Sequence, residues 1–272
     1  MLTVIIPASN EELWIGPCLS ALCASSLPQA QVIVVANGCK DKTADLARQV
    51  FAEEAPESWD CTVLDFATGS KPFALNQGDA LAKYPVRAYL DADVIVSRGL
   101  LAALVSALST DAPRYASGTP KIPPARSAVT RAYARFWKGL PFNQTTAPGY
   151  GLFAVNAAGR ARWQEFPAII SDDTFVRLQF QPDERVQVND TYLWPMIEGF
   201  AALTRVRRRQ DAGVKELERL YPGLLEREGK PPLSKTRLVG MLLQDPVGFA
   251  TYAAVSLAVR LKRGGPAFTR GR

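Results

Sequence analysis

Four short apolar runs alternate with helical segments in the first hundred residues, and this alternation constrains the fold more than any other feature. The runs cover residues 2–6, 31–36, 61–66 and 87–96. Short apolar runs of this kind are typical of strands buried on both faces. Strands that alternate with helices pair in parallel through right-handed crossovers. We therefore expect an α/β fold with a mostly parallel sheet and helices on both faces.

Two carboxylates, Asp91 and Asp93, stand one residue apart in the fourth run. On an extended strand they would point to the same face, at the edge of the sheet where open α/β folds bind ligands. Adjacent like charges repel unless a cation or a shared proton relieves them. Carboxylate oxygens and phosphates share hard divalent cations, so a metal with a nucleotide diphosphate would suit this position. A solvated turn remains the alternative, because Asp is common after strands.

Polar segments also follow the other runs, at residues 8–12, 37–43 and 69–71. Neither a G-x-G-x-x-G fingerprint nor a G-x-x-x-x-G-K-[ST] phosphate loop occurs, so the usual dinucleotide and phosphate-loop folds are not indicated. The pattern predicts a site assembled across the ends of several strands. A second acidic pair, Asp172 and Asp173, opens a predicted helix, where capping by itself would also explain it.

The sequence contains no histidine, which excludes Ser-His-Asp and Cys-His catalysis and histidine-ligated metals. A general base must then be a carboxylate, a shifted Lys, Cys or Tyr, or water. The four cysteines show no C-x-x-C spacing, so free thiols in the cytoplasm are expected. The chain begins directly with a strand pattern, and we expect no secretory signal.

The positive charge is concentrated at the C-terminal end of the chain. Residues 1–198 carry 17 Lys and Arg and 20 Asp and Glu, whereas residues 199–272 carry 15 and 6. Such a basic segment favours an anionic ligand, a lipid surface or nucleic acid, although a solvated basic surface needs no partner. Residues 247–261 form a mostly apolar segment, and Arg260, Lys262 and Arg263 lie at its C-terminal end. This segment is too short to span a bilayer, which needs about 20 residues, so it would lie on a membrane or pack on the domain.

Six sequence segments together resemble the family 2 glycosyltransferases, which have the A-type, Rossmann-like nucleotide-diphospho-sugar transferase fold. Each segment is weak evidence by itself, but all six occur in the family's order. They are residues 4–12, 34–43, 69–76, 90–93, 149–151 and 171–174. The resemblance weakens after residue 210. We accordingly expect a catalytic domain at residues 1–210 and a helical, basic extension at residues 211–272.

The resemblance implies a role for each matching residue. The backbone of Pro7 and Ala8, with Glu11, would hold the base and ribose, and Asn37 would contact the base. The other residues implied to line the nucleotide-sugar pocket are Asp41, Lys71 and Asp91.

The resemblance also assigns the metal and the base. Asp93 would ligate Mg²⁺ or Mn²⁺ at the diphosphate. Asp173, or less favourably Asp172, would be the base that deprotonates the acceptor in an inverting transfer, which agrees with the absence of histidine.

Arginines 207–209 are candidates to stabilise the leaving diphosphate. Processive polysaccharide synthases of the family carry a Gln-x-x-Arg-Trp run at this position. Only Arg209 matches that run, because Val206 replaces the Gln and Gln210 replaces the Trp. Processive synthesis is therefore not expected.

The preferred function is a metal-dependent inverting glycosyltransferase that uses a nucleotide-diphosphate donor, most simply a UDP-sugar. Its acceptor would be a glycan or a lipid-linked group in cell-envelope or exopolysaccharide synthesis. We expect the protein in the cytoplasm, with attachment to the inner face of the cytoplasmic membrane left open. A non-catalytic scaffold with this nucleotide-sugar fold, acting at a membrane, is the alternative. Nucleic-acid binding ranks last, because aromatic residues do not interleave with the basic run.

Overall fold

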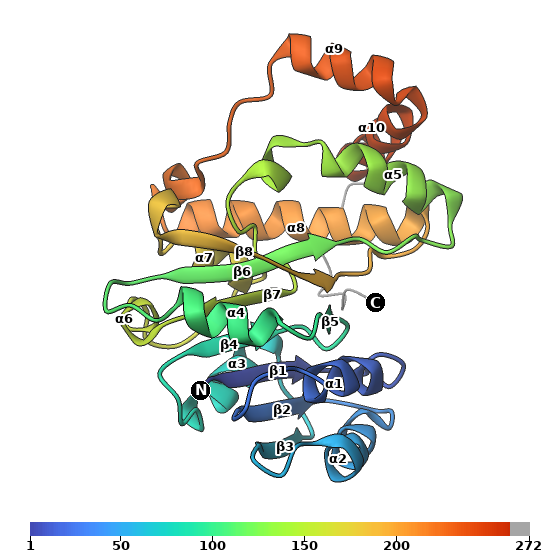
Figure 1. Cartoon of the computed structure of the whole chain (residues 1–272). Helices are drawn as coiled ribbons and strands as arrows, with labels where there is room; N and C mark the ends of the chain where they lie inside the picture. Colours follow the sequence, from blue (N-terminus) through green and yellow to red (C-terminus); the bar gives the residue numbers. More distant parts are fainter. Residues whose placement is uncertain (262–272) are drawn as a thin grey trace. The chain divides into compact units, whose positions relative to one another are not determined.

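The computed structural model describes residues 1–261 as two compact units (Figure 1). The first unit comprises residues 1–121, 149–168 and 172–194, and the other described residues form the second unit. The chain thus passes between the units several times. Helix α8 (Phe200–Leu220) continues across residue 210. The proposed division into residues 1–210 and 211–272 stays a prediction.

Strands and helices alternate along the first unit. Its strands are β1 (Thr3–Ala8), β2 (Gln31–Asn37), β3 (Asp60–Phe66), β4 (Arg87–Leu90), β5 (Ile95–Val96), β6 (Tyr115–Lys121), β7 (Leu152–Val155) and β8 (Arg185–Leu193). Its helices are α1 (Ile15–Cys23), α2 (Thr43–Glu54), α3 (Lys71–Ala80), α4 (Leu100–Ala107), α6 (Ala157–Arg160) and α7 (Asp172–Arg177), with a 3₁₀ turn η2 (Pro182–Glu184).

These strands form one sheet, in the order β3-β2-β1-β4-β7-β6-β8-β5. The first four strands in this order, β3, β2, β1 and β4, pair in parallel. Strand β7 is antiparallel to both β4 and β6, β8 is parallel to β6, and the short β5 is antiparallel to β8. The expected α/β fold with a mostly parallel sheet is confirmed.

Helices cover both faces of the sheet in the first unit. Successive residues of a buried strand point to opposite faces, so each face presents apolar side chains that a helix can cover. Val4, Ile6 and Val34 belong to a core cluster that also includes α1, α2 and α4. Ile33 and Val35 point the other way and pack with Ala74 of α3. Helix α3 can approach β1 closely because it carries Gly78, where a Cβ would lie 2.5 Å from Cγ2 of Ile5.

Strand β1 extends beyond the apolar run at residues 2–6, through Pro7 to Ala8. Pro7 is paired with Val35 of β2. The pairing of β1 with β4 stops at Ile5, so the N–H that proline lacks removes no hydrogen bond on that side. The strand therefore tolerates the proline, which lies at its carboxyl end.

The single strand expected at residues 87–96 is interrupted by a turn. Strand β4 ends at Leu90, and the backbone N–H of Val94 donates to the carbonyl of Asp91 at 3.1 Å. The chain then resumes as β5, which pairs with β8. Asp91 and Asp93 therefore do not lie on one extended strand, and the prediction that they do is wrong. The turn, and not an extended strand, sets the directions of the two carboxylates.

The second unit is mainly helical. It contains α5 (Ala128–Lys138), the 3₁₀ turns η1 (Pro141–Gln144) and η3 (Leu224–Glu228), α8, α9 (Lys235–Gln244) and α10 (Pro246–Leu261). The predicted C-terminal helical region is confirmed. In residues 1–261 no single helix is both long and apolar enough to cross a bilayer, whereas α9 and α10 together meet those criteria as a pair bent by 118°.

The basic run at residues 205–210 lies inside α8. Arg207 donates to Asp211 at 3.0 Å, one helical turn further along, and to the Tyr252 hydroxyl of α10 at 3.0 Å. Its guanidinium also lies over the Tyr252 ring. Arg207 thus helps hold α10 against α8.

Candidate active site

A pocket lies at the carboxyl ends of β1 and β4 in the first unit. Pro7 comes from β1, and Tyr89 and Leu90 come from β4. The remaining lining residues are Lys71, Leu75, Asp91, Gly149, Gly151, Phe153, Asp172 and Asp173. Ligands of open α/β sheets bind at this edge of the strands. The pocket combines an apolar floor with one lysine and three carboxylates.

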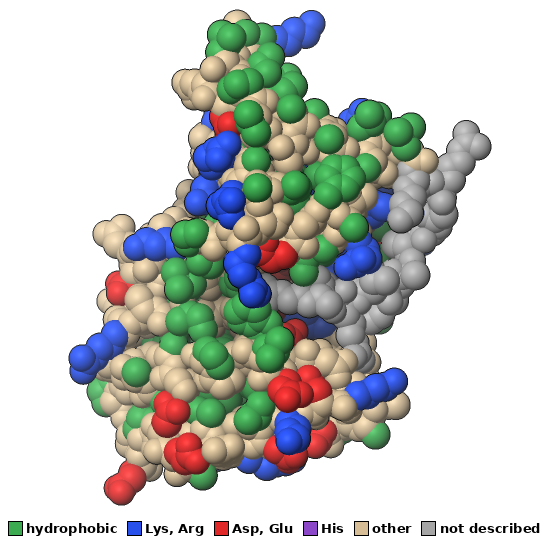
Figure 2. All heavy atoms as spheres, turned by 90° about the vertical axis from the view of Figure 1, so that its right-hand side faces the viewer, with side chains coloured by type: hydrophobic (Ala, Val, Ile, Leu, Met, Phe, Trp, Pro, Cys, Tyr) green, Lys and Arg blue, Asp and Glu red, His purple; other side chains and the backbone are tan. Residues whose placement is uncertain are grey.

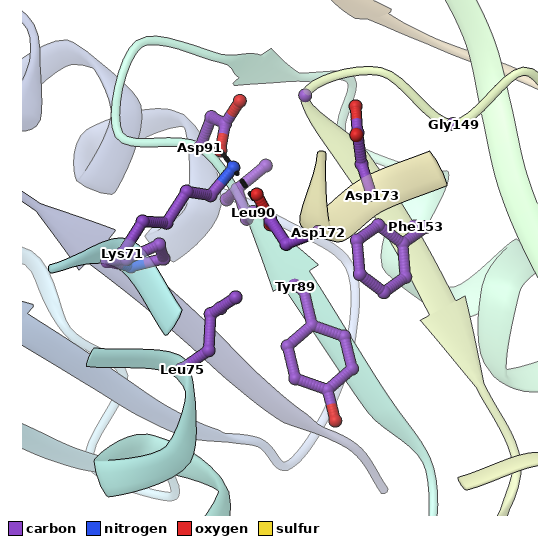
Figure 3. A pocket seen from close by; sticks show the side chains of 11 residues that line it. Lys71, Leu75, Tyr89, Leu90, Asp91, Gly149, Phe153, Asp172 and Asp173 are labelled. Atoms are coloured by element: carbon purple, nitrogen blue, oxygen red, sulfur yellow. Dashed lines mark ion pairs between the residues drawn. The ribbon is translucent and has the colours of Figure 1, made fainter. Parts of the chain in front are cut away.

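Lys71 lies between two of these carboxylates (Figure 3). Its Nζ is 2.8 Å from Oδ1 of Asp91 and 3.3 Å from Oδ2 of Asp172. The amine is placed by the start of α3, where the Ser70 hydroxyl caps the helix by accepting from the backbone N–H of Phe73. Loss of water around the amine opposes its charge, but the carboxylates of Asp172 and Asp91 raise the pKa of Lys71 above its ordinary value.

Asp172 is the buried member of the acidic pair that opens α7, with 4% of its surface exposed. Burial raises the pKa of Asp172 to about 6, in opposition to Lys71, and the charges of Asp173 and Asp91 add to the increase. A carboxyl with such a pKa can change its protonation state near neutral pH.

Asp173 has a different environment from its neighbour. It is half-buried, and its Oδ1 accepts from the backbone N–H of Thr174 at 2.7 Å. Figure 3 shows the Asp172 carboxylate directed toward Lys71, whereas the Asp173 carboxylate points in a different direction. Two adjacent carboxyls in unlike environments can take unlike roles in acid–base chemistry.

The segment Gly149–Gly151 forms another wall of the pocket and needs its glycines. Their φ angles are +72° and +77°, which are disfavoured for residues with a Cβ. A Cβ at Gly151 would also lie 2.5 Å from Cδ1 of Trp194. The carbonyl of Gly151 accepts from the backbone N–H of Asp91 at 2.8 Å, so this segment fixes the start of the acidic turn.

Asn37 and Ser9 join the ends of β1 and β2. The buried Asn37 side chain donates to the carbonyl of Ala8 at 3.0 Å, and the Ser9 hydroxyl donates to the carbonyl of Asn37 at 2.8 Å. The amide nitrogen of Asn37 thus holds the strand ends together. Its side-chain oxygen is the group that could accept from a nucleotide base.

Asp41 ties two loops together. It accepts from the backbone N–H of Glu12 at 3.1 Å and from the N–H and hydroxyl of Thr43 at 3.1 and 2.5 Å. The Thr43 hydroxyl in turn accepts from the backbone N–H of Glu11 at 2.8 Å. Partial burial works against the charge of Asp41, but hydrogen bonds from Thr43 and Glu12 hold its pKa below the ordinary value. Asp41 therefore shapes the loop that carries Glu11.

Asp91 and Asp93 both lie near the Cys18 thiol. Burial raises the pKa of this thiol, and the negative charges of Asp93 and then Asp91 raise it further. The structure contains, in residues 1–261, no cluster of three or more acidic or cysteine side chains arranged to hold a metal. One or two carboxylates nevertheless suffice for Mg²⁺ when phosphates complete its coordination. The oxygen donors of this turn fit a hard divalent cation of that kind.

The structure brings Pro7, Lys71, Asp91, Asp172 and Asp173 into one pocket. Ala8, Glu11, Asn37, Asp41 and Asp93 belong to strand ends and loops of the same unit. Arg209 lies on α8 of the second unit. The binding role of each of these residues stays a prediction.

Some pocket residues were missed from the sequence, namely Leu75, Tyr89, Leu90, Gly149, Gly151 and Phe153. The two glycines carried a signal, since a Gly-Tyr-Gly segment before a strand indicates unusual backbone angles. The apolar residues carried none, because a buried strand residue looks the same whether it faces a core or a pocket floor.

The chain is similar to known sugar transferases. It is 31% identical over 171 residues to the 4,4'-diaponeurosporenoate glycosyltransferase of Staphylococcus aureus strain MRSA252, a match that covers 61% of this chain and 42% of the relative. The chain thus spans less than half the length of that relative.

Solved structures show the same fold. A mannosyltransferase from Pyrobaculum calidifontis, in complex with GDP-Man and Mn²⁺, superposes with a TM-score of 0.61 at 21% identity, covering 97% of this chain and 76% of the other. Glucosyl-3-phosphoglycerate synthase from Mycobacterium tuberculosis, with Mn²⁺, UDP and glucosyl-3-phosphoglycerate, gives 0.53 at 20% identity, with 85% and 81% covered. The sequence model of the family Glycosyl transferase family 2 matches residues 3–165. The chain therefore belongs to glycosyl transferase family 2.

Proposed function

We propose that this chain is an inverting, metal-dependent glycosyltransferase that moves a sugar from a nucleotide diphosphate to an acceptor hydroxyl. The observation that carries the proposal is the pair of adjacent carboxylates in unlike environments at the start of α7. Asp172 is buried against Lys71, and Asp173 is more exposed and accepts from the backbone N–H of Thr174. A binding scaffold has no need of such a pair.

Asp173 would act as the general base. Its carboxylate takes the proton of the acceptor hydroxyl while the hydroxyl oxygen forms a bond to the anomeric carbon of the donor sugar. The bond between this carbon and the diphosphate oxygen breaks, and its electron pair remains on the departing nucleotide diphosphate. Attack from the face opposite the leaving group inverts the anomeric configuration.

Lys71 and Asp172 would position the reacting groups. The Lys71 amine holds Asp91 and Asp172 on its two sides, so the three side chains fix one another. Asp91 would then accept hydrogen bonds from the ribose or the sugar of the donor. A preorganised arrangement of this kind lowers the cost of placing the donor for attack.

The donor would occupy the ends of β1, β2 and β4. Pro7, Ala8, Glu11 and Asn37 would contact the base and ribose, and Asp41 would maintain the loop that carries Glu11. Asp93 would hold Mg²⁺ or Mn²⁺, which when bound would supply positive charge to the leaving diphosphate. The diphosphate-binding role expected for Arg209, which lies on α8 of the second unit, stays a prediction.

The comparisons support a nucleotide-sugar donor but leave its identity as a proposal. The solved relatives contain GDP-Man in one case and UDP in another. We propose a UDP-sugar as donor. The sequence relative is named as a 4,4'-diaponeurosporenoate glycosyltransferase. We propose a lipid-linked or cell-envelope acceptor for this chain.

Release of nucleotide diphosphate tests the proposal. The full chain would be incubated with a panel of UDP- and GDP-sugars, with Mn²⁺, with Mg²⁺ or with a chelator. We expect release from one donor class that depends on the metal. Asp173→Asn should lose the release, whereas Asp111→Asn, on an exposed loop, should retain it. If the parent binds a donor but releases no nucleotide diphosphate from any donor of the panel, the result would favour a non-catalytic scaffold.

A further inference from the structure

Helices α9 and α10 expose large apolar side chains where a helix surface is normally polar. Val239 and Leu243 of α9 are 53% and 77% exposed. Val247, Leu257 and Leu261 of α10 are 63%, 56% and 70% exposed. Contiguous exposed apolar surface of this kind marks sites of interaction with a protein or a membrane. We call these five residues the apolar face.

The apolar face follows helical spacing on α10. Residues 247, 250, 254, 257 and 261 recur every three or four positions, and all are apolar and exposed. The opposite side of α10 is anchored within the second unit. Val255 is fully buried, and the Phe249 and Tyr252 rings lie 5.5 and 5.1 Å from the Phe136 ring of α5. The helix is therefore fixed by one side and leaves its other apolar side uncovered.

Helix α9 is held in a similar way. Arg237 donates from Nη2 to the carbonyl of Gly139, at the end of α5, with a distance of 3.1 Å. Val239 and Leu243, one turn apart, lie on an exposed side of α9. Figure 2 shows hydrophobic side chains gathered over this part of the surface, with few acidic ones among them.

The charges around the apolar face favour a lipid surface over a protein partner. Asp245 is the one carboxylate in residues 235–261. It forms two bonds of 3.0 Å with Arg135 and also accepts from the backbone N–H of Gly248 at 2.9 Å. Lys235 and Arg260 are exposed at the two ends of the helix pair. Apolar residues flanked by cations, without an unpaired acid, match an anionic bilayer.

We propose that α9 and α10 dock this protein on the surface of an anionic bilayer through the apolar face. A bend of 118° separates α9 from α10, so the pair does not form one straight transmembrane helix. Helix α10 has 16 residues, which corresponds to about 24 Å, less than the hydrocarbon thickness of about 30 Å. The inference does not depend on the proposed sugar transfer. The predicted contribution of Lys262 and Arg263 lies outside the described residues.

Flotation of the full chain with vesicles tests the docking. One set of vesicles contains phosphatidylcholine alone, and the other contains phosphatidylcholine with phosphatidylglycerol. We expect binding to the second set that is lost at high salt, because salt screens charge attraction. Arg260→Gln should weaken this binding about fivefold. Leu243→Gln and Leu257→Gln should each weaken it about tenfold.

A matched control is Leu81→Gln, in which an exposed leucine of the first unit is changed. It should bind vesicles like the parent, and all variants should keep the parent melting temperature because these leucines contribute little to the core. A parent that binds neither set, or Leu→Gln variants that bind as well as the parent, would overturn the proposal. A third outcome would also overturn it: no vesicle binding, with light scattering that shows a dimeric parent and a monomeric Leu257→Gln variant. The apolar face would then join two copies of the chain.

Discussion

Lys71 sets the electrostatics of the pocket at the scale of single residues. Its amine contacts Asp91 and Asp172 directly, and the charge of Asp173 also acts on it. Three acidic side chains around one lysine leave an excess of negative charge. The pocket is thus suited to a ligand that brings its own cation.

The pH dependence of stability should reveal the buried state of Asp172. Its folded pKa of about 6 is above the unfolded value of about 3.9. Between these pH values the folded protein holds more protons than the unfolded chain. The contribution of Asp172 to the free energy of unfolding therefore falls as pH rises. The stability of Asp172→Asn relative to the parent should therefore increase from pH about 4 to about 6 and then level off. Urea denaturation at several pH values measures this difference, and a flat or falling difference would contradict the burial of a protonated carboxyl.

Asp93 gives a prediction about binding that is independent of turnover. Asp93→Asn should weaken binding of UDP or GDP in the presence of Mn²⁺ and leave binding without metal nearly unchanged, because the amide is a poorer cation ligand than the carboxylate. Calorimetry of the parent and variant, each with and without Mn²⁺, measures both quantities. Asp111→Asn serves as the control for the substitution type. Equal metal-dependent affinity in the parent and Asp93→Asn would remove Asp93 from the metal site.

At the scale of elements, α10 combines two apolar sides with different tasks. The side with Phe249, Tyr252 and Val255 packs in the second unit, and the side with Val247, Leu257 and Leu261 is exposed. The sequence showed an apolar segment that could either pack or lie on a membrane. The structure shows that one side packs, and lipid contact by the other side remains our proposal.

Two alanine substitutions in α10 separate these sides. Val255→Ala removes two methyl groups from a fully buried position, and it should lower the free energy of unfolding by about 2 kcal/mol. Leu257→Ala changes an exposed residue and should alter it by less than about 0.5 kcal/mol. Thermal or urea unfolding of both variants measures the contrast. A large loss for Leu257→Ala would show that the apolar face is part of the folded core.

At the scale of the whole molecule, local patterns predicted the parallel part of the sheet well. Residues 31–36 and 61–66 form strands because their apolar side chains fill both faces. The turn at Asp91 was not predicted, since the pairing of β5 with β8 joins residues about a hundred positions apart. The same holds for the contact between Lys71 and Asp172, which needs the complete sheet to bring α3 and α7 together. Local sequence rules describe short-range geometry and contain no information about such distant pairs.

The roles of Asp41 and Arg207 show a second limit of sequence reading. A ligand contact was predicted for each residue and stays a prediction, whereas the contacts that each makes within the fold were not predicted. In the structure, Asp41 holds two loops together, and Arg207 joins α8 to α10. A charge that satisfies backbone groups or a tyrosine hydroxyl has the same sequence signature as one that binds a phosphate.

The measurement that tests the central claim most directly compares Asp173→Asn with Asp172→Asn in nucleotide diphosphate release, alongside donor binding by calorimetry. If Asp173 is the base, Asp173→Asn should reduce release by about 10²–10⁴-fold and bind donor like the parent. Asp172→Asn should retain more activity, and Asp111→Asn should match the parent. Near-normal release by Asp173→Asn with an inactive Asp172→Asn would exchange the two roles, and near-normal release by both variants would contradict a carboxylate base at the start of α7.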